Sequence, residues 1–501
     1  MPPMPPITPG ELTRLAESLG LPLAEDEREE IDTLHALAEG FIGGLDLITS
    51  CPEPERPSVP FRESSVPSPE ANPLGAWVTR TSVRERADGR LAGRTLALKD
   101  NIALAGVPMA GGSDFLNGYV PEEDATIVRR VLDEGVEIVG KATCEYLSAS
   151  GGSHTSASGR VRNPHDPTRT SGGSSSGCGA LVASGEVDLA IGGDQGGSIR
   201  FPASYCGIVG MKPTHGLVPY TGILSIDAHI DHTGPMTANV MDNAMLLEVL
   251  AGSDGLDPRQ GIVATENYST AASRGVEGLR IGVLTEGFHE SVDPGVEASV
   301  RDAIASLESR GAHVVPVSVP NHAVHGGLVL PFLLIGGFEL IAGGGFPSHA
   351  CQPIPFGLAE AFARWRTHNE EMPPNVKLML LVGAHARAHG GEAVYAKAVR
   401  LREAARQDYD RVLAEIDALV MPTTPTTAPP LPSEAPSFVE TMRAISTGVA
   451  NTAQFDATGH PAISVPSNAS RGLPVGSMFV GRYWDEATLY RLAAAVEADR
   501  E

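Results

Sequence analysis

The sequence GLRIGVLTE at residues 278–286 is followed by DPGVEASVRDAIASLESRG at 293–311 and by AHVVPVSVP at 312–320. The outer two segments are short runs rich in β-branched residues, which is typical of strands, and the middle one has apolar residues at helical spacing. Asp293 is a suitable N-cap, Pro294 suits the first helical turn, and Gly311 can end the helix. This stretch therefore predicts a strand–helix–strand unit.

The same alternation runs through the chain from about residue 75. Strands are predicted at 94–102 and 188–194, and a helix, a glycine stop and a strand at 125–140. Further on, a helix near 394–416 precedes a strand at 417–423, and the chain ends with two strand-like segments and a helix over 485–498. Such alternation predicts an α/β fold, a mixed or mostly parallel sheet with helices on both faces.

The first residues have a different pattern. Thr8-Pro9-Gly10-Glu11 has the spacing of a capping box, and a second helical pattern begins near Asp26. Residues 51–73 are rich in proline and read as a linker. We therefore expect an N-terminal helical segment with its linker over 1–70 and a larger α/β domain over 71–501.

Composition narrows the possible partners. The 501 residues carry a net charge of −24, which disfavours binding to nucleic acid or to an anionic membrane surface. The five cysteines form no CxxC pair, which fits reduced thiols in the cytoplasm better than a disulfide framework. No basic segment followed by an apolar run is seen near Met1, so we expect no signal peptide.

One stretch, GGLVLPFLLIGGFELIAGGG at 326–345, is apolar enough to suggest a membrane segment. Pro331, Glu339 and seven glycines interrupt it, so we expect buried or cleft-lining structure instead. Contact with an apolar substrate or weak contact with a membrane are the alternatives.

Several common site motifs are missing or incomplete. No GxxxxGK[ST], HExxH or paired CxxC occurs, so neither a phosphate loop nor a metal or cofactor is expected. The loop DAHIDH at 227–232 contains two histidines and two aspartates. We interpret it as a structural hydrogen-bonding loop rather than as a metal site. Residues 173–177 match GxSxG, but that elbow needs a preceding strand, and 163–170 is predicted to be a loop.

Two features indicate acyl-transfer chemistry. After the strand ending in Asp194, Gly196 and Gly197 allow a tight turn whose backbone N–H groups can converge on an oxyanion. Lys99 ends an apolar strand, and burial there would disfavour its charged form, so the neutral amine could act as a base.

Three segments together resemble the amidase signature family: ALKDNI at 97–102, TSGGSSSG at 170–177 and GGDQGGSIRFPASYCGIVGMKPT at 192–214. Ser174 and Ser198 have the family's separation between its two catalytic serines, 198 − 174 = 24. The resemblance extends over about 75–495 and implies that 71–501 is the catalytic domain, with a variable region that caps the pocket at about 320–440. The segments 216–235 and 451–466 are similar to those of bacterial enantioselective, nitrile-hydratase-associated amidases.

The resemblance implies a catalytic triad. Ser198 is implied as the nucleophile, Ser174 as the bridging serine after a cis peptide, and Lys99 as the base. It also implies an oxyanion hole, supporting residues and, through the variable loop at 147–155, a substrate pocket. The oxyanion donors are the backbone N–H groups of Gln195, Gly196, Gly197 and Ser198; the supporting residues are Ser175, Asp194 and Arg200; the pocket residues are Ser148, Ala149, Ser150 and Gly151.

The expected function is therefore hydrolysis of a small-molecule amide through an acyl-enzyme, on aryl or bulky apolar amides. Anilides, carbamates or esters cleaved by the same route are one alternative, and the glutaminase component (the A chain) of a tRNA amidotransferase is another. By resemblance a homodimer is expected, built partly through the N-terminal helices. His154, His215, His232 and His460 lie near the motifs but are expected to be structural or pocket-lining, and no catalytic thiol is expected at Cys178 or Cys206.

Overall fold

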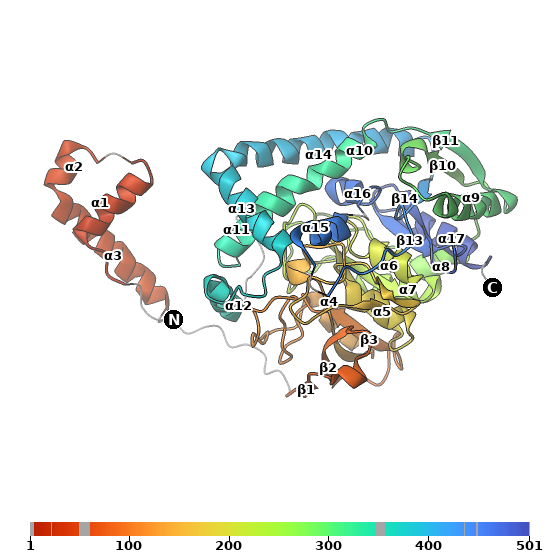
Figure 1. Ribbon diagram of the computed structural model, residues 1–501, viewed down its shortest axis with the longest axis horizontal. Coiled ribbons are helices and arrows are strands. Elements are labelled where there is room, and N and C mark those ends of the chain that lie inside the picture. The colour runs from red at the N-terminus through yellow and green to blue at the C-terminus, as the bar shows by residue number, and fades with distance from the viewer. Residues whose placement is uncertain are drawn as a thin grey trace. The chain divides into compact units, whose positions relative to one another are not determined.

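The computed structural model describes residues 5–21, 23–49, 61–345, 356–434, 436–446 and 449–499. The chain divides into two compact units, 1–58 and 59–501 (Figure 1). Residues 51–60 of the expected linker lie outside the described residues. Ser64 and Ser65, also expected in the linker, instead form the edge strand β1 of the larger unit.

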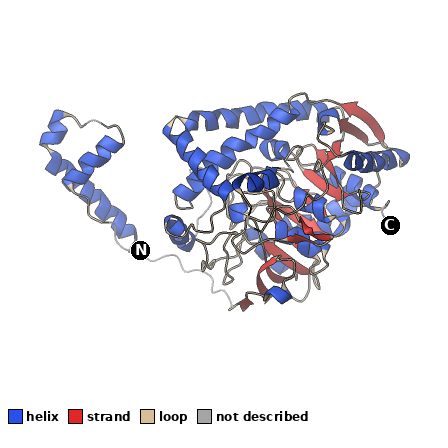
Figure 2. Cartoon of the chain, viewed as in Figure 1, coloured by secondary structure: helices blue, strands red, loops and turns tan. Residues whose placement is uncertain are grey.

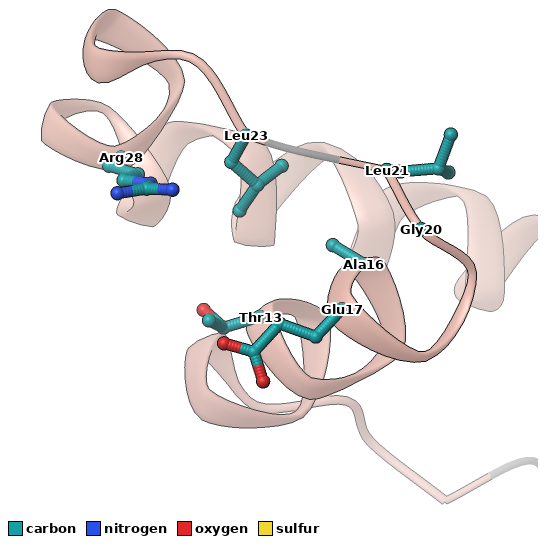
Figure 3. Close-up of a pocket in the computed structure, with 7 residues that line it drawn as sticks. All are labelled: Thr13, Ala16, Glu17, Gly20, Leu21, Leu23 and Arg28. Carbon is teal, nitrogen blue, oxygen red and sulfur yellow. The ribbon is translucent and has the colours of Figure 1, made fainter.

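The described residues of the smaller unit form three helices, α1 (Pro9–Ser18), α2 (Glu25–Glu29) and α3 (Ile31–Thr49). Thr8 is the N-cap of α1, and its hydroxyl accepts the N–H of Glu11 at 3.2 Å, as the sequence predicted. A cavity of about 640 Å³ lies beside α1 and α2 (Figure 3). Neither α1 nor α2 has a buried residue, and leucines such as Leu19 and Leu37 are exposed.

The larger unit is built on a twelve-stranded mixed sheet, so the predicted α/β class is confirmed. Strands β3, β4 and β7 are mutually parallel, as are β10, β11 and β12, whereas the pairs that join these groups are antiparallel. In spatial order the strands are β1 (Ser64–Ser65), β2 (Trp77–Val83), β4 (Glu137–Ala142), β3 (Thr95–Lys99), β7 (Leu189–Asp194), β9 (His232–Thr237), β8 (Val209–Lys212), β13 (Ala462–Pro466), β14 (Gly476–Gly481), β12 (Ala418–Pro422), β10 (Arg280–Leu284) and β11 (His313–Val317).

Helices cover both faces of this sheet (Figure 2). Successive strand residues point to opposite faces, so Leu96 and Leu98 of β3 pack in one apolar cluster and Ala97 in another. The helices of the Leu96 face are α4 (Thr126–Asp133), α7 (Val240–Leu250), α8 (Tyr268–Ala272), α9 (Pro294–Ser309) and α17 (Glu486–Glu497). Those of the Ala97 face are α5 (Ser176–Ala183), α6 (Arg200–Cys206), α14 (Gly391–Leu413) and α16 (Ala453–Thr458).

The unit predicted from residues 278–320 is confirmed. Strands β10 and β11 are parallel neighbours at the edge of the sheet, joined by α9. The carboxylate of Asp293 accepts the N–H of Gly295 at 2.8 Å, and Pro294 occupies the first turn. The residues that the sequence indicated as the start and stop of this helix therefore flank it in the structure.

Residues 326–342 of the apolar stretch belong to one long helical segment, His322–Ala342, and residues 343–345 form the turn that follows it. Among the described residues it is the helix that could cross a membrane by length and composition, and 44% of its most apolar window is buried within the protein. It comprises α10 (His322–Gly326), the 3₁₀ turn η4 (Gly327–Val329), the π-helical turn η5 (Phe332–Gly336) and α11 (Gly337–Ala342). Phe332 and Ile341 are fully buried against other helices.

The remaining elements surround this segment or connect the strands. Helices α12 (Phe356–Phe362), α13 (Pro374–Ala388) and α15 (Phe438–Ser446) lie in the variable region and its continuation. Short 3₁₀ turns are η1 (Pro69–Ala71), η2 (Tyr146–Ser148), η3 (Thr285–Gly287) and η6 (Ala363–Arg366).

Candidate active site

Lys99 and Ser174 meet on the Ala97 face of the sheet. Lys99 ends β3 two residues after Ala97, so its side chain points toward α5, which the serine run precedes. Lys99 Nζ lies 2.8 Å from Ser174 Oγ and 3.3 Å from the carbonyl oxygen of Gly193. Both side chains are fully buried, and the Gly173–Ser174 peptide bond is cis, as the resemblance implies.

Burial lowers the pKa of Lys99 below its ordinary value, because desolvation disfavours the ammonium form. Within the described part of the chain, no carboxylate forms an ion pair with it. The neighbouring lysine differs, because Lys141 lies 3.5 Å from the carboxylate of Asp100. Burial lowers the pKa of both buried lysines, but of the two only Lys141 has a carboxylate beside it, among the described residues, to stabilise its ammonium form.

The segment before the serine run is not the predicted loop. Arg162–Asn163 (β5) and Asp166–Thr170 (β6) form a two-stranded antiparallel ribbon, stabilised by a turn in which Asn163 Oδ1 accepts the N–H of His165 at 2.9 Å. This ribbon is separate from the large sheet. A strand thus precedes residues 171–177, but it is not a strand of the central sheet, which the hydrolase elbow requires.

The turn at 195–198 begins where β7 ends. The carboxylate of Asp194 accepts the N–H of Gly197 at 2.5 Å and that of Ile199 at 3.0 Å. Gly197 was predicted to be an oxyanion donor, but in this structure its N–H group donates to Asp194 instead. Among the described residues, no acceptor is paired with the N–H groups of Gln195, Gly196 or Ser198, so these three remain available to a ligand.

Ser198 ends this turn and lies next to the serine run. Its carbonyl oxygen accepts the N–H of Ser175 at 3.3 Å, so the backbone of Ser198 lies beside the residue that follows Ser174. The hydroxyl of Ser175 donates to the carbonyl of Gly193 at 3.1 Å and accepts the N–H of Gly193 at 3.2 Å. Ser175 thereby ties the serine run to β7.

Arg200 holds the turn in place. Its guanidinium forms two 3.0 Å hydrogen bonds with Asp194 and one of 2.6 Å with Asp456, and all three side chains are fully buried. It also donates to the carbonyl of Thr452 at 3.0 Å, and the hydroxyl of Thr452 donates to the carbonyl of Gly196 at 2.7 Å. Neither Thr452 nor Asp456 was predicted to contribute to the site; the only signal was their position within the family-like segment 451–466.

The two carboxyl groups on Arg200 have opposite pKa shifts. Burial alone would raise the pKa of Asp194, but the charge and hydrogen bonds of Arg200 outweigh it and hold this pKa below its usual range. Burial and the neighbouring charge of Asp194 raise the pKa of Asp456 well above its usual value. Asp194 is therefore the anion that holds the turn.

The predicted pocket loop adjoins the serine run. The carbonyl of Gly151 accepts the N–H of Gly173 at 2.9 Å, and Ser150 Oγ accepts the N–H of Gly152 at 3.1 Å. Ser148 has a positive φ angle of 60°. The carbonyl of Ala149 accepts a 2.8 Å hydrogen bond from Asn375 of α13, a contact that was not predicted from the sequence. The loop is thus hydrogen-bonded to the residue before Ser174 on one side and to α13 on the other.

Most of the histidines and cysteines near the motifs have structural contacts. The exception is His154, whose two buried ring nitrogens have no hydrogen-bond partner among the described residues, whereas His460 Nδ1 lies 2.9 Å from the hydroxyl of Thr458. His215 lies 2.9 Å from the carbonyl of Ala228, and His232 lies 2.8 Å from that of Ile230. Burial raises the pKa of the Cys178 thiol to about 12, which keeps it protonated. No group of three or more His, Cys, Asp or Glu side chains that could hold a metal ion occurs among the described residues.

A family model described as Amidase matches residues 76–490. The chain belongs to the amidase family. It is 44% identical over 454 residues to an enantioselective amidase from Rhodococcus rhodochrous, covering 87% of this chain and 86% of that protein. The predicted family is therefore confirmed, together with the predicted similarity to an enantioselective amidase, and the chain is an amide-hydrolysing enzyme of this family.

Other members of the family are also similar. The chain is 37% identical over 426 residues to the A chain of the glutamyl-tRNA(Gln) amidotransferase of Koribacter versatilis, covering 83% of this chain and 86% of that one. Among solved structures, the native peptide amidase of Stenotrophomonas maltophilia has a TM-score of 0.69 at 33% identity, covering 82% of this chain and 83% of that one. The amidase family fold is thus confirmed as well.

Proposed function

We propose that this family member hydrolyses amides through Ser198, Ser174 and Lys99. The observation that carries the proposal is the buried 2.8 Å contact between Lys99 Nζ and Ser174 Oγ, in surroundings that disfavour the ammonium form. A neutral amine beside a hydroxyl is the arrangement that a base-activated nucleophile needs. The contact between Ser175 and Ser198 supports Ser198 as the next group in the relay.

The proposed reaction begins with proton transfer from Ser198 to Ser174 and from Ser174 to neutral Lys99. Ser198 Oγ attacks the amide carbon, and the carbonyl oxygen becomes an oxyanion held by the N–H groups of Gln195, Gly196 and Ser198. The proton on Lys99 returns through Ser174 to the leaving nitrogen, and the C–N bond breaks to leave an acyl-Ser198 ester. Water then attacks this ester by the same route and releases the carboxylate.

The proposed substrates are amides with an aryl or bulky apolar group. The similarity to an enantioselective amidase supports a small amide, and the apolar helical segment 322–342 of the variable region supports an apolar group on it. Comparable kcat/KM values for benzamide-type and short aliphatic amides would contradict this specificity. A panel of aliphatic amides, aryl amides, anilides, carbamates and esters, read by product mass, also tests the alternative acyl-transfer substrates.

Replacing the nucleophile tests the mechanism. Ser198→Ala should abolish amide hydrolysis while the thermal unfolding temperature stays close to that of the wild type. The matched control is Ser176→Ala, because Ser176 is a buried serine of the same run whose hydroxyl donates to the carbonyl of Thr143 at 3.3 Å. Normal turnover by Ser198→Ala would refute the proposal.

The same assay separates a free-standing amidase from the glutaminase component of a larger enzyme. The chain is similar to several proteins named as the A chain of a tRNA amidotransferase, at lower identity than to the enantioselective amidase. A free-standing enzyme should hydrolyse simple amides when purified alone. Ammonia release from glutamine only, and only after a partner is added, would favour the amidotransferase function.

We also propose a cytoplasmic homodimer that uses the N-terminal helices. The exposed leucines of α1 and α3 and of the turn after α1, such as Leu19 and Leu37, supply apolar surface that a second copy could cover. Light scattering should give twice the chain mass for the full chain and the single chain mass after Leu19→Glu and Leu37→Glu. A monomeric wild type would refute this arrangement.

A further inference from the structure

The loop between β8 and β9 contains the DAHIDH motif, for which the proposed reaction has no role. Asp231 in this motif is 1% exposed, and its Oδ1 accepts a hydrogen bond from Gln195 Nε2 at 3.1 Å. The same carboxylate accepts the N–H of Ile226 at 3.2 Å and the hydroxyl of Ser225. A loop that the sequence indicated to be structural thus reaches the residue that opens the proposed oxyanion turn.

Tyr220 provides a second contact for the same side chain. Gln195 Nε2 donates to the hydroxyl of Tyr220 at 2.8 Å, and Tyr220 is 1% exposed. Arg259 fixes both partners, because its guanidinium lies 4.8 Å from the Tyr220 ring centre and donates to the carbonyl of Asp231 at 2.9 Å. The carboxamide of Gln195 is therefore held between two side chains that are themselves immobilised.

The loop also contacts the strand end that carries Lys99. The carbonyl of Asn101 accepts the N–H of Leu224 at 2.8 Å, and Ala103 donates its N–H to the carbonyl of Gly222 at 3.0 Å. The segment that holds Gln195 is thus hydrogen-bonded to the chain two residues beyond Lys99. The loop therefore connects the proposed base with the proposed oxyanion donors.

A turn containing Gly196 and Gly197 needs outside contacts to keep one conformation, since glycine has the greatest backbone freedom. Asp194 supplies one contact by accepting the N–H of Gly197, and Thr452 supplies another by donating to the carbonyl of Gly196. The side chain of Gln195 is the third contact. This contact restrains Gln195, whose own backbone N–H is the first of the three that are available to a ligand.

We propose that Asp231 and Tyr220 are positioning residues for catalysis, which hold Gln195 so that the N–H groups of Gln195 and Gly196 point at the oxyanion. This inference rests on the proposed function, and the residues act only through Gln195. Misplacement of catalytic groups by about 1 Å costs roughly 100-fold in rate, and loss of one oxyanion donor costs about 10²–10³-fold.

Kinetics of Asp231→Ala and Asp231→Asn on a primary aryl amide test the proposal. Asp231→Ala should lower kcat by about 10–100-fold with little change in KM, because the oxyanion exists only in the transition state. Asp231→Asn is the matched comparison: its Oδ1 can still accept from Gln195 and Ile226, so it should recover most of the activity that Asp231→Ala loses. Binding of phenylboronic acid, which forms a tetrahedral adduct with a serine, should weaken in parallel with kcat in Asp231→Ala.

A second pair of variants applies if Asp231→Ala does not fold. Gln195→Glu places a carboxylate against that of Asp231, so kcat should fall at a pH well above neutral, where both groups are ionised. Adding Asp231→Asn to this variant gives the introduced carboxylate an amide donor and should restore part of kcat. Loss in the single variant with recovery in the double variant supports a positioning contact, since general destabilisation would grow with a second buried change.

The outcomes separate this inference from the proposed mechanism. If Ser198→Ala is inactive but Gln195→Glu and every folded Asp231 variant retain wild-type kcat and boronic acid affinity, the positioning role is wrong and the mechanism stands. A rise in KM with kcat unchanged would also overturn the inference. If Ser198→Ala retains turnover, the mechanism itself fails.

Discussion

Replacing Lys99 by methionine should change the pH dependence of stability as well as lower the catalytic rate. Methionine has nearly the same length and no charge, so it fills the space on the Ala97 face of β3. The buried amine lies against a hydroxyl and a carbonyl, at 2.8 Å from Ser174 and 3.3 Å from Gly193. The variant therefore tests whether the folded chain holds a neutral amine at this position.

The sign of the effect follows from the direction of the pKa shift. Burial lowers the pKa of Lys99 in the folded chain below the usual lysine value of 10.5. Between the folded pKa and 10.5 the unfolded chain binds one proton more than the folded chain, so the free energy of unfolding rises with pH. The slope contributed by Lys99 is about 1.4 kcal/mol per pH unit across this window and vanishes on either side of it.

The measurement is urea unfolding of the wild type and Lys99→Met at a series of pH values. The difference in free energy of unfolding, wild type minus variant, should rise with pH through the window. Burial also lowers the pKa of Lys141 and that of Lys212, the latter to about 7, but both residues are present in the two proteins and cancel in the difference. Lys377→Met, at an exposed position of α13, is the control for removing a lysine.

Activity provides the parallel test. Wild-type kcat/KM should rise with pH as Lys99 loses its proton, and Lys99→Met should lose about 10²–10⁴-fold, the contribution of a general base. A stability difference that does not depend on pH would show that the folded chain keeps the ammonium form. The assignment of Lys99 as the base would then be refuted.

Two further predictions concern the surroundings of the site. Arg200→Met removes the partner of the buried Asp194 and Asp456 carboxyl groups, so urea unfolding should show a loss of about 3–5 kcal/mol; a loss below about 1 kcal/mol would contradict the role of Arg200 in holding the turn. Because burial raises the pKa of Cys178 to about 12, iodoacetamide at neutral pH should leave Cys178 unmodified in mass spectra of the native enzyme, and an alkylated Cys178 would contradict its buried position.

Local patterns in the sequence were sufficient where the signal lies within a few residues. The helix Pro294–Ser309 was predicted from Asp293, Pro294 and Gly311, and the structure places its ends within two residues of that prediction. The ribbon at 162–170 was missed because Pro164 and Pro167 make the segment resemble a loop, whereas its short strands depend on the turn at Asn163.

Contacts between distant residues could not be predicted from such patterns. Asp456 meets Arg200 across 256 positions of the chain, and nothing near either residue indicates the other. Gly197 was predicted as an oxyanion donor from the resemblance and its glycine turn, and the sequence gives no orientation for the carboxylate of Asp194. Motifs identified the candidate site, but which N–H groups are free to bind an oxyanion depends on the three-dimensional orientation of Asp194.

The order of the strands has a consequence for synthesis of the protein on the ribosome. β8, at Val209–Lys212, has β9 on one side, but its other neighbour is β13, at Ala462–Pro466. The first half of the sheet can therefore form early, while one edge of β8 stays open until nearly the whole chain has emerged. Open strand edges are templates for pairing with other chains. We therefore expect that a ribosome stalled before residue 462 leaves a product that aggregates, and that translation speed or chaperone access limits the yield of active enzyme.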